Sequence, residues 1–266
     1  MIHEIKMNEI YCMDNLELLK KMKSNSVDLI YCDILYNTGK KFKDYDDRLG
    51  TPQQAMEWYR PRLIEMKRVL KETGLILLQM DYRLHPYVRI EMDNIYGIDN
   101  LVNDLIWQYS GGGVPKNKFA PKHDNILLYS KGNSYTFNVD ILRVSYSEST
   151  KKRFKGTINN KRNGIDFGQQ ELNKLGKHPE SVISMPILAP SSNERVGYET
   201  QKPKHLLEYL IKGLSNEGDI IADFFCGSGT SLVVAKELNR KYIGCDINPR
   251  AIEITNKRLN DIKIGG

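Results

Sequence analysis

Two short segments of the chain combine acidic, aromatic and glycine residues in a way that can support chemistry. The first is Asp33-Ile34-Leu35-Tyr36-Asn37-Thr38-Gly39, which follows the apolar run 27–32. Such a run is typical of a buried strand, and open α/β sheets bind ligands beyond the carboxyl ends of their strands. There Asp33 can accept hydrogen bonds from a ligand, and Tyr36 can stack on it. A turn after a strand also serves packing alone, so this segment needs a partner elsewhere in the chain.

The second segment, Asp223-Phe224-Phe225-Cys226-Gly227-Ser228-Gly229-Thr230, lies between a predicted strand and a predicted helix. Glycines at such a turn let the backbone approach a ligand closely. The next predicted strand runs up to Asp246, where Rossmann-like sheets place the acid that binds ribose hydroxyls. No lysine follows the glycines and the Gly-x-x-Gly pattern is incomplete, so a P-loop is excluded and a dinucleotide is disfavoured. The pattern indicates a cofactor that contains a nucleoside and no phosphates.

The elements that position these segments alternate between strands and helices, which is typical of an α/β fold. Apolar runs predict strands over 9–12, 27–32, 75–80, 102–109, 125–130, 219–222 and 241–245. Apolar stripes of helical period predict helices over 14–22, 58–70, 205–214, 230–238 and 249–259, with Gly74 ending the second of these. The glycine-rich segment 111–115 is predicted to be a mobile loop. A βαβα unit therefore closes the chain.

Composition and charge limit the classes of function. The chain has 266 residues, 40% of them hydrophobic, and no apolar run of membrane-spanning length, so no membrane partner is expected. The start of the chain has no apolar core typical of a signal peptide, and a cytoplasmic protein is expected. The four cysteines have no metal-ligand spacing, so no metal is expected. The net charge of +6 permits a polyanionic partner.

Residues 132–195 interrupt the alternation of strands and helices. This stretch lacks a long amphipathic period and is predicted to be an insert between two halves of one core, 1–131 and 196–266. Its basic side chains are candidates for contact with nucleic-acid phosphates. They are Lys151, Lys152, Arg153, Lys155, Lys161 and Arg162.

Together these segments resemble the motifs of the amino-group DNA methyltransferases of the permuted β class. Asp223 to Thr230 is similar to that family's cofactor motif D-P-F-x-G-S-G-T, and Asp33 to Tyr36 is similar to its catalytic tetrapeptide D-P-P-Y. Thr200-Gln201-Lys202-Pro203 resembles the T-Q-K-P signature that precedes the cofactor strand. Residues 37–46 resemble the modification subunits of type III systems, and residues 122–131 resemble a later core motif. The resemblance covers the whole chain except the insert.

The resemblance implies a fold, a cofactor and a set of partners. The fold is a Rossmann-like, seven-stranded mixed sheet in permuted order, in which residues 9–12 lie beside residues 241–245, and the insert is a target recognition region. The cofactor is S-adenosyl-L-methionine, and the partners are double-stranded DNA, a second copy of the chain and a cognate restriction enzyme. The residues implied to bind the cofactor are Asp14, Asp33, Thr200, Gln201, Lys202, Asp223, Phe224, Phe225, Cys226, Gly227, Ser228, Gly229, Thr230 and Asp246.

Within this resemblance Asp14 faces the adenine of the cofactor, Asp246 its ribose and Asp223 its amino group. The catalytic residues are Asp33, Ile34, Leu35 and Tyr36. The Asp33 carboxylate and the Ile34 main-chain carbonyl accept hydrogen bonds from a target amino group and localise its lone pair, while Tyr36 stacks on the flipped base.

The resemblance leaves three functions open, and in this chain Ile34 and Leu35 replace both prolines of the tetrapeptide, which supports the catalytically silent one. The expected function is transfer of a methyl group to N6 of adenine at specific sites in DNA, which Asp rather than Ser at position 33 favours. The alternatives are transfer to N4 of cytosine and a catalytically silent DNA-binding subunit of a modification system. Loss of the two prolines is expected to weaken a preorganised site roughly tenfold, because each loss costs about 0.4–1 kcal/mol of chain entropy.

Overall fold

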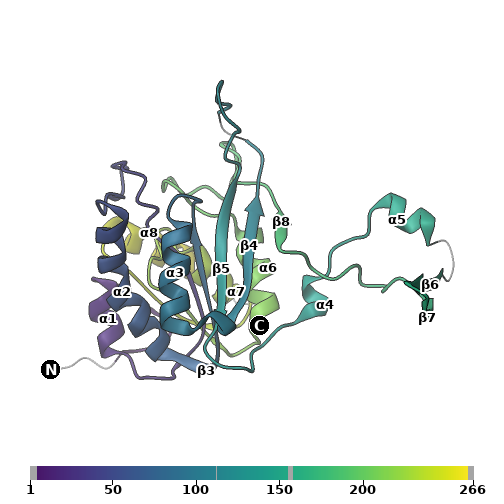
Figure 1. Ribbon diagram of the computed structural model, residues 1–266. Helices are drawn as coiled ribbons and strands as arrows, with labels where there is room; N and C mark the ends of the chain where they lie inside the picture. Colours follow the sequence, from purple (N-terminus) through teal and green to yellow (C-terminus); the bar gives the residue numbers. More distant parts are fainter. Residues whose placement is uncertain (1–4, 112, 155–157, 263–266) are drawn as a thin grey trace. The chain divides into compact units, whose positions relative to one another are not determined.

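A computed structural model describes residues 5–111, 113–154 and 158–262 of the chain (Figure 1). The chain forms two compact units. Unit 1 comprises Met1–Phe137 and Ser181–Gly266, and unit 2 comprises Asn138–Glu180. Unit 2 lies within the insert expected over residues 132–195.

Unit 1 is built on one mixed sheet of eight strands, in the order β1-β10-β9-β2-β3-β5-β4-β8. The pairs from β1 to β3 along this order are parallel, β5 is antiparallel to both β3 and β4, and β8 is parallel to β4. The strands are β1 (Glu9–Cys12), β2 (Val27–Asp33), β3 (Leu70–Met80), β4 (Leu101–Gln108), β5 (His123–Ser130), β8 (Val182–Ser184), β9 (Ile220–Asp223) and β10 (Lys241–Asp246). The Rossmann-like mixed sheet is therefore confirmed, with one short strand more than the expected seven.

The permuted order is visible in the first strand pair. β1, near the beginning of the chain, pairs in parallel with β10, near its end, and Cys12 lies opposite Asp246. The predicted neighbourhood of residues 9–12 and 241–245 is confirmed. As a consequence, the acid that follows β1 and the acid that ends β10 meet at the same edge of the sheet.

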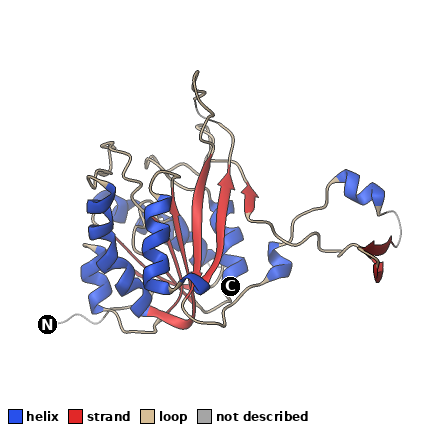
Figure 2. Cartoon of the chain, viewed as in Figure 1, coloured by secondary structure: helices blue, strands red, loops and turns tan. Residues whose placement is uncertain are grey.

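Helices cover both faces of the sheet (Figure 2). Along β2, Ile30 and Cys32 pack with α1, α2 and α3, whereas Leu29 and Tyr31 pack with α6, α7 and α8. This alternation follows from the two-residue period of a strand, and burial on both faces explains the nearly continuous apolar run. The helices are α1 (Asn15–Lys21), α2 (Pro52–Val69), α3 (His85–Tyr96), α6 (Lys204–Leu214), α7 (Thr230–Glu237) and α8 (Pro249–Asn260), with a short 3-10 turn, η1 (Ile98–Asn100), before β4.

The boundaries around α2 and β3 correct the sequence prediction. α2 begins at Pro52 rather than at residue 58, because Thr51 and Gln54 form a capping box and proline suits the first helical turn. Gly74 does not end this helix; it lies inside β3, which follows α2 directly at Leu70. Helix α3 was not predicted.

Unit 2 consists of two short helices and one hairpin. The helices are α4 (Val139–Leu142) and α5 (Glu148–Arg153), and the hairpin pairs β6 (Ile158–Arg162) with β7 (Ile165–Gln170). No element was predicted here, because these segments are too short to show a clear period. β8, although inside the expected insert, belongs to the sheet of unit 1. Among all the helices described, none has the length and apolar character needed to cross a bilayer.

Candidate active site

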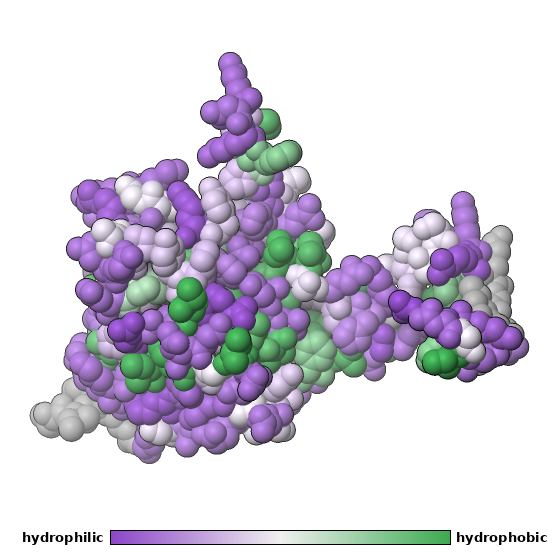
Figure 3. Space-filling model, in the orientation of Figure 1, coloured by the Kyte–Doolittle hydropathy of each residue, from purple (hydrophilic) through white to green (hydrophobic). Residues whose placement is uncertain are grey.

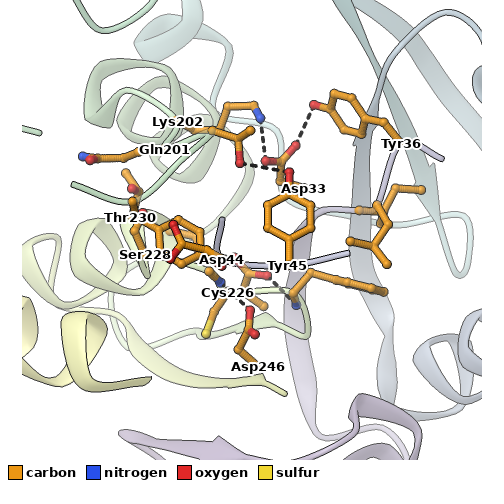
Figure 4. A pocket seen from close by; sticks show the side chains of 18 of the residues that line it. Asp33, Tyr36, Asp44, Tyr45, Gln201, Lys202, Cys226, Ser228, Thr230 and Asp246 are labelled. Carbon is orange, nitrogen blue, oxygen red and sulfur yellow. Dashed lines mark hydrogen bonds and ion pairs between the residues drawn. The ribbon is translucent and has the colours of Figure 1, made fainter. Parts of the chain in front are cut away.

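Four acids stand at one edge of the sheet, each directly after or at the end of a parallel strand. Asp14 follows β1, and Asp33, Asp223 and Asp246 end β2, β9 and β10. The parallel register brings these carboxyl ends together, as expected for a ligand site of an open α/β sheet. All four acids line one cavity of about 610 Å³, part of which is shown in Figure 4.

Asp33 is held by two side chains from different parts of the sequence. Lys202 Nζ lies 2.5 Å from Asp33 Oδ2, and the Tyr36 hydroxyl donates to Asp33 Oδ1 at 2.7 Å (Figure 4). Burial raises the pKa of Asp33, and the Lys202 ammonium opposes that rise. This pairing joins the segment resembling D-P-P-Y to the segment resembling T-Q-K-P.

A buried polar network continues from Tyr36 to Asp124, which is 6% exposed. Asp124 Oδ2 accepts from the Tyr36 hydroxyl at 2.9 Å and from Gln79 Nε2 at 2.9 Å, and Oδ1 accepts from the Tyr109 hydroxyl at 3.0 Å. Tyr36 has one hydroxyl proton to share between the carboxylates of Asp33 and Asp124. The network therefore fixes the position of the Tyr36 ring from both sides.

Hydrogen bonds hold the backbone of residues 34 and 35 in place. The Ile34 N–H donates to the Gln79 carbonyl at 3.1 Å, which extends the β2–β3 pairing by one step. The buried Tyr59 hydroxyl donates to the Leu35 carbonyl at 2.7 Å. Proline at position 34 has no N–H and could not make the first bond. These two hydrogen bonds fix the backbone at the two positions where the related tetrapeptide has prolines.

Asp223 is buried among neutral hydrogen-bond donors. Its carboxylate accepts from the Ser231 hydroxyl and, at 3.0 Å, from the Phe225 N–H. Burial raises the pKa of Asp223 to about 7, and these hydrogen bonds oppose the rise. A carboxyl group with this pKa gains strongly from a cation brought by a ligand.

The glycine turn after Asp223 positions a carboxylate of the cavity and lets helices α7 and α8 pack closely. The Gly227 N–H donates to Asp246 Oδ2 at 2.9 Å, so the turn fixes the carboxylate that ends β10. Gly229 precedes α7 with φ +72°, and a Cβ there would lie 2.2 Å from Thr255 Cγ2 of α8. Gly229 is therefore required by a left-handed conformation and by close helix packing. It is the one residue of this motif that does not line the cavity.

Asp14 is tied to helices α1 and α2. Its Oδ1 accepts from the Leu16 N–H and caps α1, and its Oδ2 lies 2.7 Å from Arg62 Nη2. The Arg62 guanidinium stacks 3.5 Å from the centre of the Trp58 ring, which also lines the cavity. Asp14 and Trp58 thus form one rigid wall of the cavity beside Phe225.

The loop after Tyr36 joins the two halves of the cavity wall. The Lys43 N–H donates to Glu199 Oε2 at 2.7 Å, and the Tyr45 hydroxyl lies 3.3 Å from Thr200 Oγ1. Asp44, whose side chain is 1% exposed, pairs with Arg250. Gln201 Nε2 donates to the Glu194 carbonyl at 2.8 Å, and Gln201 Oε1 accepts from the Val196 N–H at 3.0 Å.

The cavity brings together most of the residues predicted from the sequence. Its lining includes Asp14, Asp33, Ile34, Leu35, Tyr36, Thr200, Gln201, Lys202, Asp223, Phe224, Phe225, Cys226, Gly227, Ser228, Thr230 and Asp246. Sequence reasoning missed Asp44, Asp124 and Tyr109 as members of the site. One feature of the sequence could have indicated Asp124: it stands directly before a predicted strand, in a segment that resembles a family motif.

Five of the six predicted basic residues are described, and all five belong to unit 2. Lys151 pairs with Glu148 at 2.8 Å, and Lys161 pairs with Asp166 at 3.5 Å. The Arg153 guanidinium lies 5.2 Å from the centre of the Phe154 ring. Lys152 and Arg162 are exposed. Lys155, like Gly112 of the predicted mobile loop, lies outside the described residues.

Known proteins share both the sequence pattern and the fold. Relatives include the type II methyltransferase M.HpaI of Haemophilus parainfluenzae, 34% identical over 94% of this chain and 74% of that protein. Another is the DNA adenine methyltransferase YhdJ of Escherichia coli, 30% identical over 93% of this chain and 81% of that protein. The solved PvuII DNA methyltransferase, described as cytosine-N4-specific, has a TM-score of 0.69 and 17% identity over 96% of this chain and 88% of its own.

A second solved structure, of M1.HpyAVI in complex with S-adenosylmethionine, has a TM-score of 0.60 and 20% identity over 95% of this chain and 98% of its own. The family model described as DNA methylase matches residues 27–257, which include both acid-bearing segments and everything between them. The chain therefore belongs to the DNA methylase family of S-adenosylmethionine-dependent amino-group methyltransferases.

Proposed function

We propose that this DNA methyltransferase moves the methyl group of S-adenosylmethionine to the exocyclic N6 of adenine at specific sites in double-stranded DNA. The observation that carries the proposal is the position of Asp33, a mostly buried carboxylate held by Lys202 and Tyr36 in the same cavity as Asp223. Asp rather than Ser at position 33 favours adenine, as does the adenine named for the relative YhdJ. The cytosine named for the PvuII enzyme makes N4 transfer the alternative.

The cavity fits the cofactor in size and in the chemistry of its lining. A volume of about 610 Å³ lies in the range of small-molecule sites. Asp223 meets the ammonium group of the methionyl part, Asp246 meets the ribose hydroxyls, and Asp14 and Trp58 enclose the adenine. When bound, the cofactor supplies an electrophilic methyl group on a sulfonium. The raised pKa of Asp223 in the free protein supports this assignment. A bound ammonium group lowers the pKa of a neighbouring carboxyl group, so it stabilises the ionised form of Asp223 that burial disfavours.

Asp33 activates the target amino group in this proposal. An exocyclic amino group is a poor nucleophile because its lone pair is delocalised into the ring. Each Asp33 oxygen receives one hydrogen bond from the protein and keeps a lone pair for a target N–H. The Ile34 carbonyl accepts the second N–H. The cofactor would supply the methyl group from its sulfonium, and Asp33 would take the amino proton that the target nitrogen loses on methylation.

The hydrogen bonds around residues 34 and 35 favour an active enzyme over a silent subunit. Gln79 and Tyr59 fix the backbone on either side of the Ile34 carbonyl. A site held in this way loses less preorganisation than the missing prolines alone imply. Nothing about residues 33–36 then requires the chain to be catalytically silent.

We assign the basic side chains of unit 2 to the phosphates of DNA. Phosphate contacts position a protein on the duplex without reading its sequence. The exposed Lys152 and Arg162 are available for such contacts, and Lys151 exchanges its partner Glu148 for a phosphate. A second copy of the chain and a cognate restriction enzyme complete the proposed partners.

Transfer of a labelled methyl group to unmethylated DNA tests the proposal. The purified chain, shown to be folded by circular dichroism, is incubated with labelled S-adenosylmethionine and bacterial DNA from a strain without methyltransferases. We expect the wild type to label DNA and Asp33→Ala to fail while still binding the cofactor. Asp99→Ala changes an exposed carboxylate in η1, before the amino end of β4, and serves as the matched control. A folded wild type that labels no DNA contradicts the proposal.

A further inference from the structure

The hairpin between β4 and β5 carries an extended arm, residues 113–122, at the cavity edge of the sheet. β4 ends and β5 begins at this edge, because β5 is antiparallel to both β3 and β4. Figure 1 shows the arm rising beyond the ends of these strands, and Figure 3 shows it as a narrow, mainly hydrophilic projection. None of its residues lines the cavity, so the proposed function does not use it.

The arm joins basic charge to an exposed aromatic ring. It contains Lys116, Lys118 and Lys122 and no acidic residue. The Phe119 side chain is 100% exposed, the highest value among the exposed large hydrophobic residues described. Water disfavours such exposure of an aromatic ring, and apolar groups presented in this way mark binding surfaces.

Hydrogen bonds fix the base of the arm to the candidate site. Lys122 Nζ donates to the carbonyls of Gly113, at 3.0 Å, and Gly111. The Tyr109 N–H donates to the Lys122 carbonyl at 3.0 Å, and the Tyr109 hydroxyl donates to Asp124, the partner of Tyr36. The arm is therefore joined to three residues that line the cavity: Trp107 in β4, Tyr109 just after β4, and Asp124 in β5.

DNA is the partner that matches this combination. Lysines bind phosphates, and an aromatic or apolar side chain inserted between base pairs holds a duplex that has been unstacked. An enzyme that acts on an exocyclic amino group must take the base out of the stack, which leaves a gap in the duplex. An aromatic ring can occupy that gap through stacking on the neighbouring bases.

We propose that the arm binds the target duplex beside the cavity, with Lys116 and Lys118 on phosphates and the Phe119 ring in the gap left by the flipped base. This inference rests on the proposed function, because a gap forms only if the enzyme flips its target. In this proposal Phe119 stabilises the DNA in which the target base is flipped out, and it does not contact the reacting atoms. The arm thus acts on the binding of DNA and the flipping of the target base, and it affects the rate of methylation through them.

Single-turnover methylation of two duplexes tests the role of Phe119. The recognition sequence is first read by sequencing methylated DNA from cells that express the chain. One duplex carries the target base in its normal pair, and the other carries it opposite an abasic position, where flipping costs less. Phe119→Ala is compared with Phe119→Trp and with the control Ile98→Ala, which removes an exposed side chain at the other end of β4.

We expect Phe119→Ala to slow methylation of the paired target roughly fivefold to a hundredfold, since stacking is worth about 1–3 kcal/mol per base. On the abasic duplex the same variant stays within about threefold of the wild type, and Phe119→Trp and Ile98→Ala match the wild type on both. Equal losses on both duplexes, or no loss on the paired one, overturn the proposal. A change in self-association without a change in methylation also overturns it. A wild type inactive on both duplexes instead contradicts the proposed function.

The salt dependence of DNA binding tests the lysines separately. In Lys116→Gln/Lys118→Gln the slope of log affinity against log salt is expected to flatten by about two, because each phosphate contact contributes about 0.9. Lys241→Gln changes an exposed lysine at the opposite edge of the sheet and is expected to leave the slope unchanged. An unchanged slope in the double variant would show that Lys116 and Lys118 do not contact DNA phosphates, and it would contradict the proposal.

Discussion

The two acids at the centre of the site, Asp33 and Asp223, have the same position in their strands but different surroundings. Asp33 has a cation from the chain itself, Lys202, within 2.5 Å. Asp223 has a hydroxyl and an N–H as partners, and its pKa rises to about 7. In the proposed function, the chain's own cation therefore stabilises the ionised form of Asp33, whereas the ammonium group of the bound cofactor stabilises the ionised form of Asp223.

Removal of Lys202, the cation beside Asp33, is expected to have the largest effect of the changes proposed below. In Lys202→Gln, burial raises the pKa of Asp33 with the Tyr36 hydrogen bond but no cation opposing it, so a smaller fraction of Asp33 is ionised at neutral pH. Single-turnover methylation at pH 7 is expected to fall at least tenfold and to recover as the pH rises toward 9. Lys204→Gln, which removes the neighbouring Lys204–Glu237 pair, serves as the control. A loss that does not depend on pH contradicts this role of Lys202.

Cofactor binding is expected to depend on the ionisation of Asp223. Below about pH 7 the carboxyl group is protonated in the free protein and cannot pair with an ammonium group. The affinity for S-adenosylmethionine is therefore expected to fall as the pH drops from 8 to 6, by up to about tenfold per unit. Calorimetric titration at several pH values measures this, with Asp223→Asn showing weak binding and no such dependence. Equal affinity of the wild type at pH 6 and 8 contradicts the prediction.

The same acid is expected to destabilise the protein that holds no cofactor. Its folded pKa of about 7 exceeds the usual value of 3.8, so the folded state binds the proton more tightly than the unfolded state. Its contribution to stability is complete below pH 3.8 and is lost as the pH rises through 7. Asp223→Asn is expected to raise the melting temperature at pH 8 when no cofactor is present, by several degrees in a thermal scan. A lower melting temperature means that the hydrogen bonds to Ser231 and Phe225 outweigh the cost of burial.

Asp124 offers a smaller test of how Asp33 is supported. Asp124→Asn replaces one of the two acceptor oxygens that serve Tyr36, Gln79 and Tyr109 by a donor and removes the negative charge. We expect methylation to fall by up to about tenfold with cofactor affinity unchanged, because Asp124 acts through Tyr36. A double-mutant cycle with Tyr36→Phe measures the coupling, and independent effects of the two changes contradict a shared network.

The smallest effect concerns the tetrapeptide backbone. Ile34→Pro restores a residue of the family pattern and removes the N–H that donates to the Gln79 carbonyl. The loss is expected to cost about 1 kcal/mol of unfolding free energy, measured by urea denaturation, with Ile34→Val as the control. A stabilised proline variant shows that chain entropy outweighs this hydrogen bond at position 34.

The same comparison shows why much of the site could be predicted from the sequence. Asp33 and Asp223 end largely apolar strands, and parallel pairing brings strand ends together whatever their distance in the chain. The pKa difference between them was not predictable, because it depends on Lys202 and Ser231 reaching the two acids in the folded chain. Asp124 reaches the site from the start of an antiparallel strand, and no local pattern indicates which side chain it meets.

Outside the site, the errors of prediction concern the boundaries of single helices and strands. Helix α2 was predicted too short because its first turn depends on the capping box of Thr51 and Gln54, and the apolar stripe begins later. Gly74 is a reasonable helix terminator in isolation, yet Leu70 already ends the helix and the glycine lies in β3. The elements of unit 2 are too short for periodicity to indicate them.

The central claim, that this site methylates adenine at N6, is tested most directly by the identity of the modified base. DNA is incubated with the enzyme and S-adenosylmethionine that carries a deuterated methyl group, and its nucleosides are separated and measured by mass spectrometry. The account predicts deuterated N6-methyladenine with the wild type and none with Asp33→Ala. Deuterated N4-methylcytosine, or the same amount of labelled adenine with Asp33→Ala, would contradict it.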